Sequence, residues 1–294
     1  MTGGLISGSD LGTKLGVSRA AIWQRIEFLK SLGVQIDSSD AGYQLTHPVY
    51  IPDAEAIAKK VTIPVEFISE VDSTNTMVLD SQEDGCLLTL YQRHGRGRRG
   101  RKWLAAPGYA VMMSVGVSLR YGVQDLSGLS VDVGVGICRY LRTLNIPARL
   151  KWPNDIWIAD RKLGGILIEM RGDQDRAFIA IGFGMNLIKT DGIDTLIAAS
   201  NDFLSKTWSD QETIALINAI QSTAMLYTTL SYEQRAQRYR EVSLLEGVEI
   251  SVVGEQTELR GIAQGIDEFG RLSILTDSGI ELISAGEVSV RPTE

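Results

Sequence analysis

The 294-residue chain has few of the side chains that build disulfide frameworks or structural metal sites. It contains two cysteines, Cys86 and Cys138, and two histidines, His47 and His94, and none of them is spaced as a cluster of metal ligands. This scarcity argues against a disulfide scaffold and against structural zinc. We therefore expect a protein of the reducing cytoplasm.

Long apolar runs and an excess of positive charge are also missing. The longest apolar segment, Ala110 to Leu119, has ten residues, which is too short to cross a bilayer. The first residues carry no apolar core of the signal-peptide type. The formal net charge is −7, whereas a protein that coats nucleic acid in general is expected to be basic throughout.

Against this acidic background one segment is strongly basic. It reads Gly95-Arg96-Gly97-Arg98-Arg99-Gly100-Arg101-Lys102-Trp103, and five of its first eight residues are cationic. Glycine lets backbone N–H groups approach phosphate oxygens, and arginine binds such oxygens bidentately. We interpret the segment as a loop that closes over a small molecule carrying phosphates. The alternative is a solvated basic loop or a localisation patch, the usual role of a basic run.

The basic loop also matches the dinucleotide-binding pattern Gly-x-Gly-x-x-Gly, but that match is spurious. The pattern requires an apolar helix to begin at once, and here Pro107 and Gly108 follow. The chain has no Gly-x-x-x-x-Gly-Lys-Ser/Thr loop either. The loop is therefore a different kind of phosphate-binding device.

Residues 1–46 are predicted to form a winged helix-turn-helix. Ser9 is expected to cap a helix that ends at Leu15, and Ser18 a second helix over 19–32, followed by Gly33. Residues 34–36 and 43–45 then form a hairpin. The DNA-facing residues of the second helix would be Ser18, Arg19, Gln24 and Arg25.

Two observations weigh against DNA binding by residues 1–46. The segment holds four Lys/Arg and four Asp/Glu, so it has no net attraction for phosphates. A winged helix normally has another helix before the turn motif, and only residues 1–8 precede it here. We expect an incomplete module, and a small helical protein–protein module remains the alternative.

Residues 47–243 are predicted to form an α+β domain, a mostly antiparallel sheet with helices on one side. Residues 244–294 show short alternating strands separated by glycines, which indicates a small five-stranded barrel. The expected strands are 65–68, 86–92, 110–119, 156–159, 162–170 and 178–187, then 248–253, 259–266, 272–275, 280–283 and 288–290. The expected helices are 54–60, 126–144, 211–230 and 232–242, with a polar loop over 189–209.

Besides the basic loop, three further polar segments stand out in the central domain. Asp72-Ser73-Thr74-Asn75 begins a helix, where such residues usually act as caps. Lys151-Trp152-Pro153-Asn154-Asp155 is a rigid polar turn. Lys162 precedes Gly164-Gly165, and Gly182-Phe183-Gly184-Met185-Asn186 interrupts a buried strand; glycines there leave room for a ligand or form a bulge.

In this order, the four segments resemble those of biotin protein ligases of the bifunctional bacterial type, which also repress the biotin operon. The resemblance covers nearly the whole chain. It implies an N-terminal winged helix, a class II synthetase-like ligase domain and an SH3-like β-barrel. It also implies a reaction in which biotin and ATP, with Mg²⁺, form biotinoyl-5′-AMP. The biotinyl group then passes to a lysine of the biotin carboxyl carrier protein of acetyl-CoA carboxylase.

The resemblance also implies roles for individual residues. Lys162 and Arg98 would be catalytic, and Asp155 could hold Mg²⁺. The biotin site would comprise Ser73, Thr74, Asn75, Gln92, Gly95, Arg96, Gly97, Arg98, Lys162 and Gly182. The ATP and adenylate site would comprise Arg98, Arg101, Lys102, Trp103, Asn154, Asp155, Lys162 and Asn186.

Some features depart from the family pattern or leave alternatives open. Residues 189–209 do not follow the pattern, so Trp208 is only a guess for the aromatic that covers the adenine. Gly164 replaces a commoner alanine, a change expected to be harmless. Operator DNA is a possible partner, and the resemblance implies a homodimer when the adenylate is bound. The rivals are an enzyme like the lipoate–protein ligases and a DNA-binding biotin sensor without ligase activity.

Overall fold

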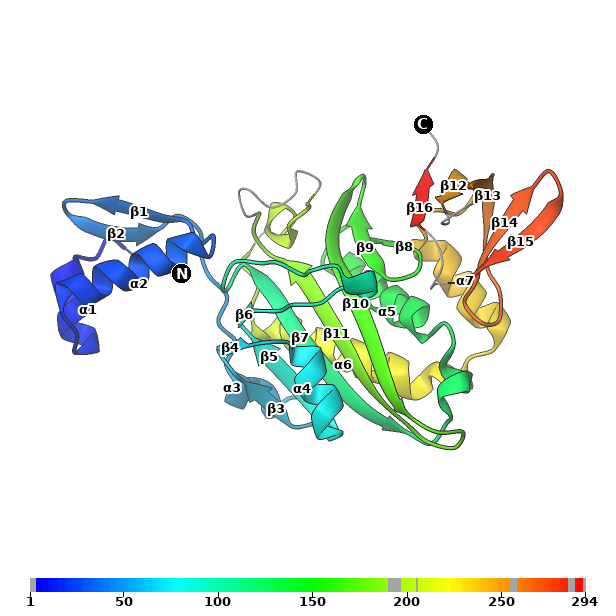
Figure 1. Ribbon diagram of the computed structural model, residues 1–294, viewed down its shortest axis with the longest axis horizontal. Helices are drawn as coiled ribbons and strands as arrows, with labels where there is room; N and C mark the ends of the chain where they lie inside the picture. Colours follow the sequence, from blue (N-terminus) through cyan, green and yellow to red (C-terminus); the bar gives the residue numbers. More distant parts are fainter. Residues whose placement is uncertain (1–3, 190–196, 205, 254–257, 285–288, 293–294) are drawn as a thin grey trace.

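The computed structural model of the protein describes residues 4–189, 197–204, 206–253, 258–284 and 289–292. An N-terminal helical module, a large central sheet with helices, and a small C-terminal sheet follow one another across the molecule (Figure 1). Among the described residues, no helix combines the length and the apolar character that crossing a membrane requires.

The N-terminal module has the predicted elements with shifted boundaries. They are α1 (Gly8–Leu15), α2 (Arg19–Ser31), β1 (Ile36–Ser39) and β2 (Gly42–Leu45). The expected cap at Ser9 is wrong, because Ser7 caps α1. The Ser7 hydroxyl accepts from the backbone N–H of Asp10 at 3.0 Å and donates to the Asp10 carboxylate at 2.8 Å. Ser18 caps α2 as predicted and accepts from the backbone of Ala21.

The central domain is built on a seven-stranded sheet in the order β3-β5-β7-β11-β10-β9-β8. Neighbouring strands are antiparallel except for β3 and β5. A two-residue parallel pair, β4 and β6, lies beside it. The bounds are β3 (Val65–Phe67), β4 (Glu70–Val71), β5 (Gly85–Thr89), β6 (Tyr91–Gln92), β7 (Ala110–Leu119), β8 (Arg149–Lys151), β9 (Asp155–Ile158), β10 (Arg161–Gly172) and β11 (Ala177–Asn186).

Helices cover both faces of this sheet, so the expectation of helices on one side is wrong. The helices are α3 (Ala54–Ala58), α4 (Thr74–Ser81), α5 (Leu129–Thr143), α6 (Asp210–Leu226) and α7 (Tyr232–Val242). Odd-numbered residues of β11, such as Ile181, join the main core with α5 and α6. Even-numbered Phe178 and Ala180 pack instead with Val78 of α4. Because successive side chains of a strand point to opposite faces, the sheet lies between two layers of helices.

The C-terminal part is a five-stranded antiparallel sheet in the order β15-β14-β13-β12-β16, which confirms the predicted strands. They are β12 (Glu249–Val253), β13 (Glu258–Ile266), β14 (Leu272–Thr276), β15 (Gly279–Ile283) and β16 (Ser289–Pro292). The turn between β13 and β14 reaches the central domain. There Gly270 packs on Gly128, and its carbonyl accepts the indole N–H of Trp152 at 2.9 Å.

Candidate active site

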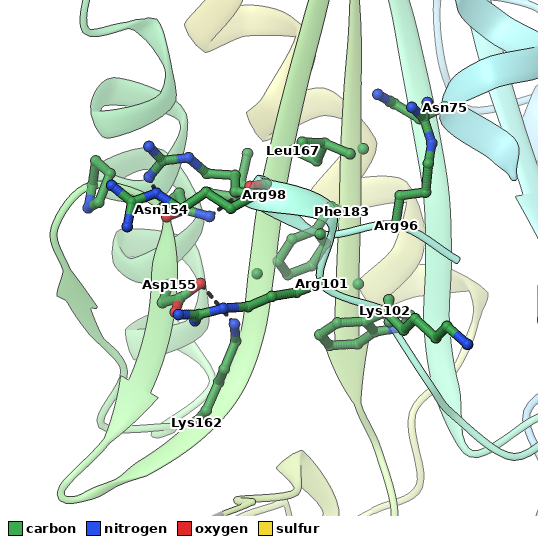
Figure 2. A pocket seen from close by; sticks show the side chains of 18 of the residues that line it. Asn75, Arg96, Arg98, Arg101, Lys102, Asn154, Asp155, Lys162, Leu167 and Phe183 are labelled. Carbon is green, nitrogen blue, oxygen red and sulfur yellow. Dashed lines mark hydrogen bonds and ion pairs between the residues drawn. The ribbon is translucent and has the colours of Figure 1, made fainter. Parts of the chain in front are cut away.

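A cavity of about 350 Å³ opens on the face of the central sheet that carries α4 (Figure 2). The four polar segments singled out in the sequence all line it, although they are far apart along the chain. Of the predicted site residues, the lining contains Ser73, Thr74, Asn75, Gln92, Arg96, Gly97, Arg98, Arg101, Lys102, Trp103, Asn154, Asp155, Lys162 and Gly182. The sheet order explains their meeting, because β7, β11, β10 and β9 are neighbours.

Two predicted site residues do not line the cavity. Gly95 is buried at the base of the basic loop, where a Cβ would come within 2.5 Å of the carbonyl oxygen of Trp103. Asn186 ends β11 and pairs with Ala110 of β7. Gly95 therefore supports the backbone of the loop, and Asn186 supports the end of the strand.

Charge in the cavity is strongly one-sided. Seven lysine and arginine side chains line it, and Asp155 is the one carboxylate among the lining residues. This concentration lies in a chain of net charge −7. The site is therefore suited to an anionic ligand.

The start of α4 forms one wall. Ser73 caps the helix, as expected from its position. The backbone N–H of Thr74 donates to the Gln92 side-chain oxygen at 2.9 Å, and the Thr74 hydroxyl donates to the same atom at 3.2 Å. Ser114 of β7 donates to the Thr74 hydroxyl at 2.8 Å. The start of α4 and Gln92, which the sequence analysis assigned separately to the biotin site, are thus joined by hydrogen bonds.

The basic loop folds back on itself as a short hairpin. The N–H of Gly97 donates to the carbonyl of Arg101 at 2.7 Å, and the N–H of Trp103 donates to the carbonyl of Gly95 at 2.8 Å. Gly100 adopts a φ of 69°, a left-handed conformation that favours glycine. The hairpin directs several of its cationic side chains into the cavity, as Figure 2 shows for Arg98 and Arg101.

Arg98 is half-buried and crosses to the Lys-Trp-Pro-Asn-Asp turn. Its Nη1 donates to Oδ1 of Asn154 at 2.9 Å, and Asn154 is fixed in turn by donating to the carbonyl of Ile166 at 2.9 Å. Burial lowers the pKa of Arg98 below its usual value, as does the neighbouring charge of Arg99, while Asp155 opposes the shift. Guanidinium groups remain protonated in proteins, so a fixed cation stands in the cavity.

Lys162 faces the same space from β10. The Lys162 Nζ lies 2.8 Å from Oδ1 of Asp155. In the sheet, Lys162 stands opposite Trp157 of β9. Gly165 is less constrained than its pattern indicated, because a Cβ there would meet Lys162 and Asp155 at 3.4 Å, an ordinary contact. Gly164 is more constrained, since a Cβ would lie 2.6 Å from the carbonyl oxygen of Gly184. The nearby carbonyl gives glycine at 164 a structural reason in this chain, and the expectation that it is harmless in place of alanine stays a prediction.

The structure also brings to the cavity side chains that were not among the predicted site residues. Trp157 and Lys151 both line the cavity, and Nζ of Lys151 lies 4.2 Å from the centroid of the Trp157 ring. The alternation of β9, with Ile156 and Ile158 buried, places Trp157 on the same face as Asp155, a signal available in the sequence. The guess at Trp208 is wrong, because that side chain is buried and donates to Thr213 outside the cavity.

Comparison with known proteins agrees with this site. The description "Biotin/lipoate A/B protein ligase family" matches residues 67–186, a range that contains every residue lining the cavity. The bifunctional ligase/repressor BirA of Escherichia coli is 33% identical over 307 residues, which cover 98% of this chain and 94% of that protein. The chain belongs to the biotin protein ligase family.

Further matches extend the likeness of this ligase to its relatives. The biotin–[acetyl-CoA-carboxylase] ligase of Mycobacterium tuberculosis is 30% identical over 239 residues, covering 76% of this chain and 88% of that protein. The biotin protein ligase from Aquifex aeolicus, solved in complex with biotin and ATP, has a TM-score of 0.67 and 25% identity. That match covers 78% of this chain and 99% of the other.

The outer parts of the ligase match families of their own. The description "HTH domain" fits residues 1–44, and "Biotin protein ligase C terminal domain" fits residues 247–291. These matches agree with the predicted helix-turn-helix and with the predicted β module. All three parts of the chain thus have counterparts in known families.

Proposed function

We propose that the protein joins biotin to a lysine of a biotin carboxyl carrier protein, at the expense of ATP and through biotinoyl-5′-AMP. The observation that carries the proposal is the meeting of four polar segments around one cationic cavity, in a chain of the biotin protein ligase family. The relative from Aquifex aeolicus was solved with biotin and ATP. We also propose that residues 47–243 perform the ligation, between an N-terminal module of 1–46 and a C-terminal one of 244–294.

In the first step, a carboxylate oxygen of biotin forms a bond to the α-phosphorus of ATP, and pyrophosphate leaves. Two anions must approach each other, so the barrier depends on fixed positive charge where charge develops. Arg98 supplies such charge from the basic loop and Lys162 from β10, and each is held by a partner, Asn154 or Asp155. Their roles are to bind the reacting carboxylate and phosphate and to hold them together.

Magnesium fits this site as a companion of ATP. Mg²⁺ is usually bound through one or two carboxylates plus substrate phosphates. The cavity offers one carboxylate, Asp155, beside the amide oxygen of Asn154. No cluster of three or more His, Cys, Asp or Glu occurs among the described residues, so a site made by the protein alone is not indicated there. Asp155 would hold the metal together with the phosphates, and the metal would neutralise their charge.

In the second step, the amine of the carrier lysine attacks the acyl carbon, and AMP leaves. The mixed anhydride hydrolyses in water, so the site must exclude water until the carrier docks. The hairpin of the basic loop forms one side of the cavity, and Trp103 packs from it onto Gly184. We assign to this loop the role of a lid over the adenylate.

Exchange of pyrophosphate into ATP tests the proposal directly. The protein should catalyse exchange that depends on biotin and Mg²⁺, and it should label a carrier domain from radioactive biotin. Exchange with lipoate but not biotin would replace the proposal by the lipoate alternative. A protein that binds biotin without any exchange would instead be a sensor and not a ligase.

A second function, repression of transcription, is favoured by the N-terminal module. α2 has the capped start of a recognition helix, and Arg19, Gln24 and Arg25 are exposed on it. The bifunctional relatives are named as ligase/repressors. We propose that ordering of the loop by biotinoyl-AMP promotes a homodimer that binds operator DNA. A mobility shift that strengthens with the adenylate would support this coupling, and a shift indifferent to the adenylate would refute it.

A further inference from the structure

Glu169 of β10 ties the basic loop to the rest of the domain. Its carboxylate accepts two hydrogen bonds from the guanidinium of Arg96, from Nη1 at 2.9 Å and from Nη2 at 2.5 Å. It also accepts from Nδ2 of Asn75 at 2.6 Å. Bidentate pairs of this kind are among the stronger polar contacts in proteins. One side chain thus joins a strand of the sheet, the first turn of α4 and the first arm of the loop.

The contacts form a closed ring. Nη2 of Arg96 also donates to the hydroxyl of Thr76 at 2.8 Å, and Thr76 follows Asn75 directly in α4. The ring therefore runs from α4 through Asn75, Glu169 and Arg96 back to α4. Figure 2 shows Arg96 extending from the loop toward Asn75. The loop arm cannot move away from the wall of the cavity without breaking several of these bonds.

Glu169 also fixes the orientation of the Asn75 amide. Because Nδ2 donates to Glu169, Oδ1 is left to accept from Ser114 at 3.2 Å. This oxygen lies against Gly182, where a Cβ would come within 2.8 Å of it. Rotating the amide would place its NH₂ group toward Ser114 and its oxygen against the carboxylate. The carboxylate therefore selects one of the two amide orientations.

The ring changes the distribution of charge in the cavity. Arg96 is neutralised by Glu169, so its guanidinium is not a free cation for a substrate anion. Arg98 donates to the neutral side chain of Asn154, and Lys162 pairs with Asp155. The task of binding the substrate carboxylate thus falls on the other cations that line the cavity, Arg98 and Lys162 among them, and Arg96 serves to dock the loop.

We propose that Glu169 is a positioning residue for biotin. It docks the first arm of the lid through Arg96 and orients the amide of Asn75. Within the proposed function, Glu169 acts on retention of biotin and adenylate through these two residues, without touching the reacting atoms. Its loss raises the KM for biotin and frees the loop, while the adenylation rate at saturating substrate changes little.

Glu169→Gln tests this role because glutamine keeps the size of the side chain and removes its charge. We expect KM for biotin to rise about tenfold with kcat within about twofold, as for loss of a charge-assisted pair. Trypsin should cut the ligand-free variant in the basic loop about tenfold faster than the wild type. The ligase function and the role of Glu169 are tested separately. Absence of pyrophosphate exchange by the wild type would contradict the ligase function, whereas the rate of loop cleavage tests the role of Glu169 alone.

Asp80→Asn is the matched control. Asp80 of α4 forms an ion pair with Arg171 of β10 at 2.6 Å, and in the described part of the chain neither side chain has a hydrogen bond or ion pair to the loop. This variant should keep the wild-type KM and the wild-type cleavage rate. The double variant Glu169→Gln/Arg96→Gln should have the same KM for biotin and the same rate of loop cleavage as Arg96→Gln alone. Unchanged KM and cleavage in Glu169→Gln, equal effects in Asp80→Asn, or additive effects in the pair would each overturn the proposal.

Discussion

Trp103 and Gly184 pack so closely that no side chain fits between them. A Cβ at position 184 would lie 2.5 Å from Cε2 of Trp103 and 2.7 Å from Cζ2. The basic loop therefore seats its tryptophan directly on the backbone of β11. The glycines of this strand, which the sequence indicated as places of close approach, serve that purpose at 184.

Gly184→Ala should displace Trp103 and, with it, the lid. We expect KM for ATP in pyrophosphate exchange to rise about fivefold to a hundredfold, because overpacking of this kind costs about 1–3 kcal/mol. In a Trp103→Ala background the same substitution should have little further effect, since the clashing ring is gone. A full effect in that background would show that Gly184 acts by some other route.

Arg98→Gly should weaken the retention of biotinoyl-AMP. The variant loses a cation held by Asn154 at 2.9 Å inside the cavity. The adenylate should dissociate about tenfold to a hundredfold faster, as expected for a charge-assisted contact of about 1.5–3 kcal/mol. Released adenylate should then label lysines of bystander proteins. Arg139→Ala, on an exposed arginine of α5, controls for loss of surface charge, and an unchanged off-rate in Arg98→Gly would contradict this role.

Lys162→Gln should slow adenylation about 10²- to 10³-fold, the usual cost of removing a group that stabilises charge in the transition state. Asp155 offers a way to separate two explanations, because it lies 2.8 Å from Lys162. If Lys162 acts on the substrates, Lys162→Gln/Asp155→Asn should be slower in pyrophosphate exchange than Asp155→Asn alone. If Lys162 only neutralises Asp155, the double variant and Asp155→Asn should be equally slow.

Trp152→Phe should loosen the C-terminal sheet from the ligase domain. Trp152 is buried and donates its indole N–H to the carbonyl of Gly270 at 2.9 Å. Loss of this bond and of ring volume should lower the free energy of unfolding by about 1–3 kcal/mol in urea titration. Trp23→Phe is the control, because Trp23 is 56% exposed on α2 and its change should cost about 0.5 kcal/mol or less. Equal losses in both variants would count against the contact.

The contribution of Asp132 to the free energy of unfolding should fall as the pH rises from about 4 to about 6. Burial raises its pKa from 3.8 to about 6, and the nearby Arg235 opposes the shift. Between these values the folded state binds more protons than the unfolded state, so this group's contribution to stability decreases from about pH 4 to pH 6. The full change is at most about 3 kcal/mol. Asp132→Asn should lack this component when unfolding is measured at pH 4 and pH 7, and identical pH profiles would refute it.

Sequence reasoning singled out most of the residues that line the cavity, because its signals are local. The arginines and glycines of the basic loop, the cap at Ser73 and the turn at Asn154 are each written in a few neighbouring residues. Alternation and helical spacing likewise predicted strands such as β7, whose bounds agree with the expected 110–119. Helix ends were predicted less well. Ser7 and Ser9 could both cap α1, and the hydrogen bond between Ser7 and Asp10 favours Ser7.

Relationships between distant segments could not be obtained in the same way. Glu169 stands in an ordinary strand, and only the packing of α4 and the loop on that face brings Arg96 and Asn75 to it. The requirement for Gly164 arises from the approach of β11, and the burial of Trp208 from α6. No short pattern around these residues distinguishes them from their neighbours.

The sequence by itself determined which chemistry the chain can hold: a cationic loop, a helix start rich in hydroxyls, a polar turn and a lysine before glycines. The tertiary structure decided which of those groups face one another and which charges are free. The physical reason is that helix and strand formation depends on neighbours in sequence. The pairing of Arg96 with Glu169 instead depends on strand order, on which face of the sheet each side chain occupies, and on how closely two backbones approach.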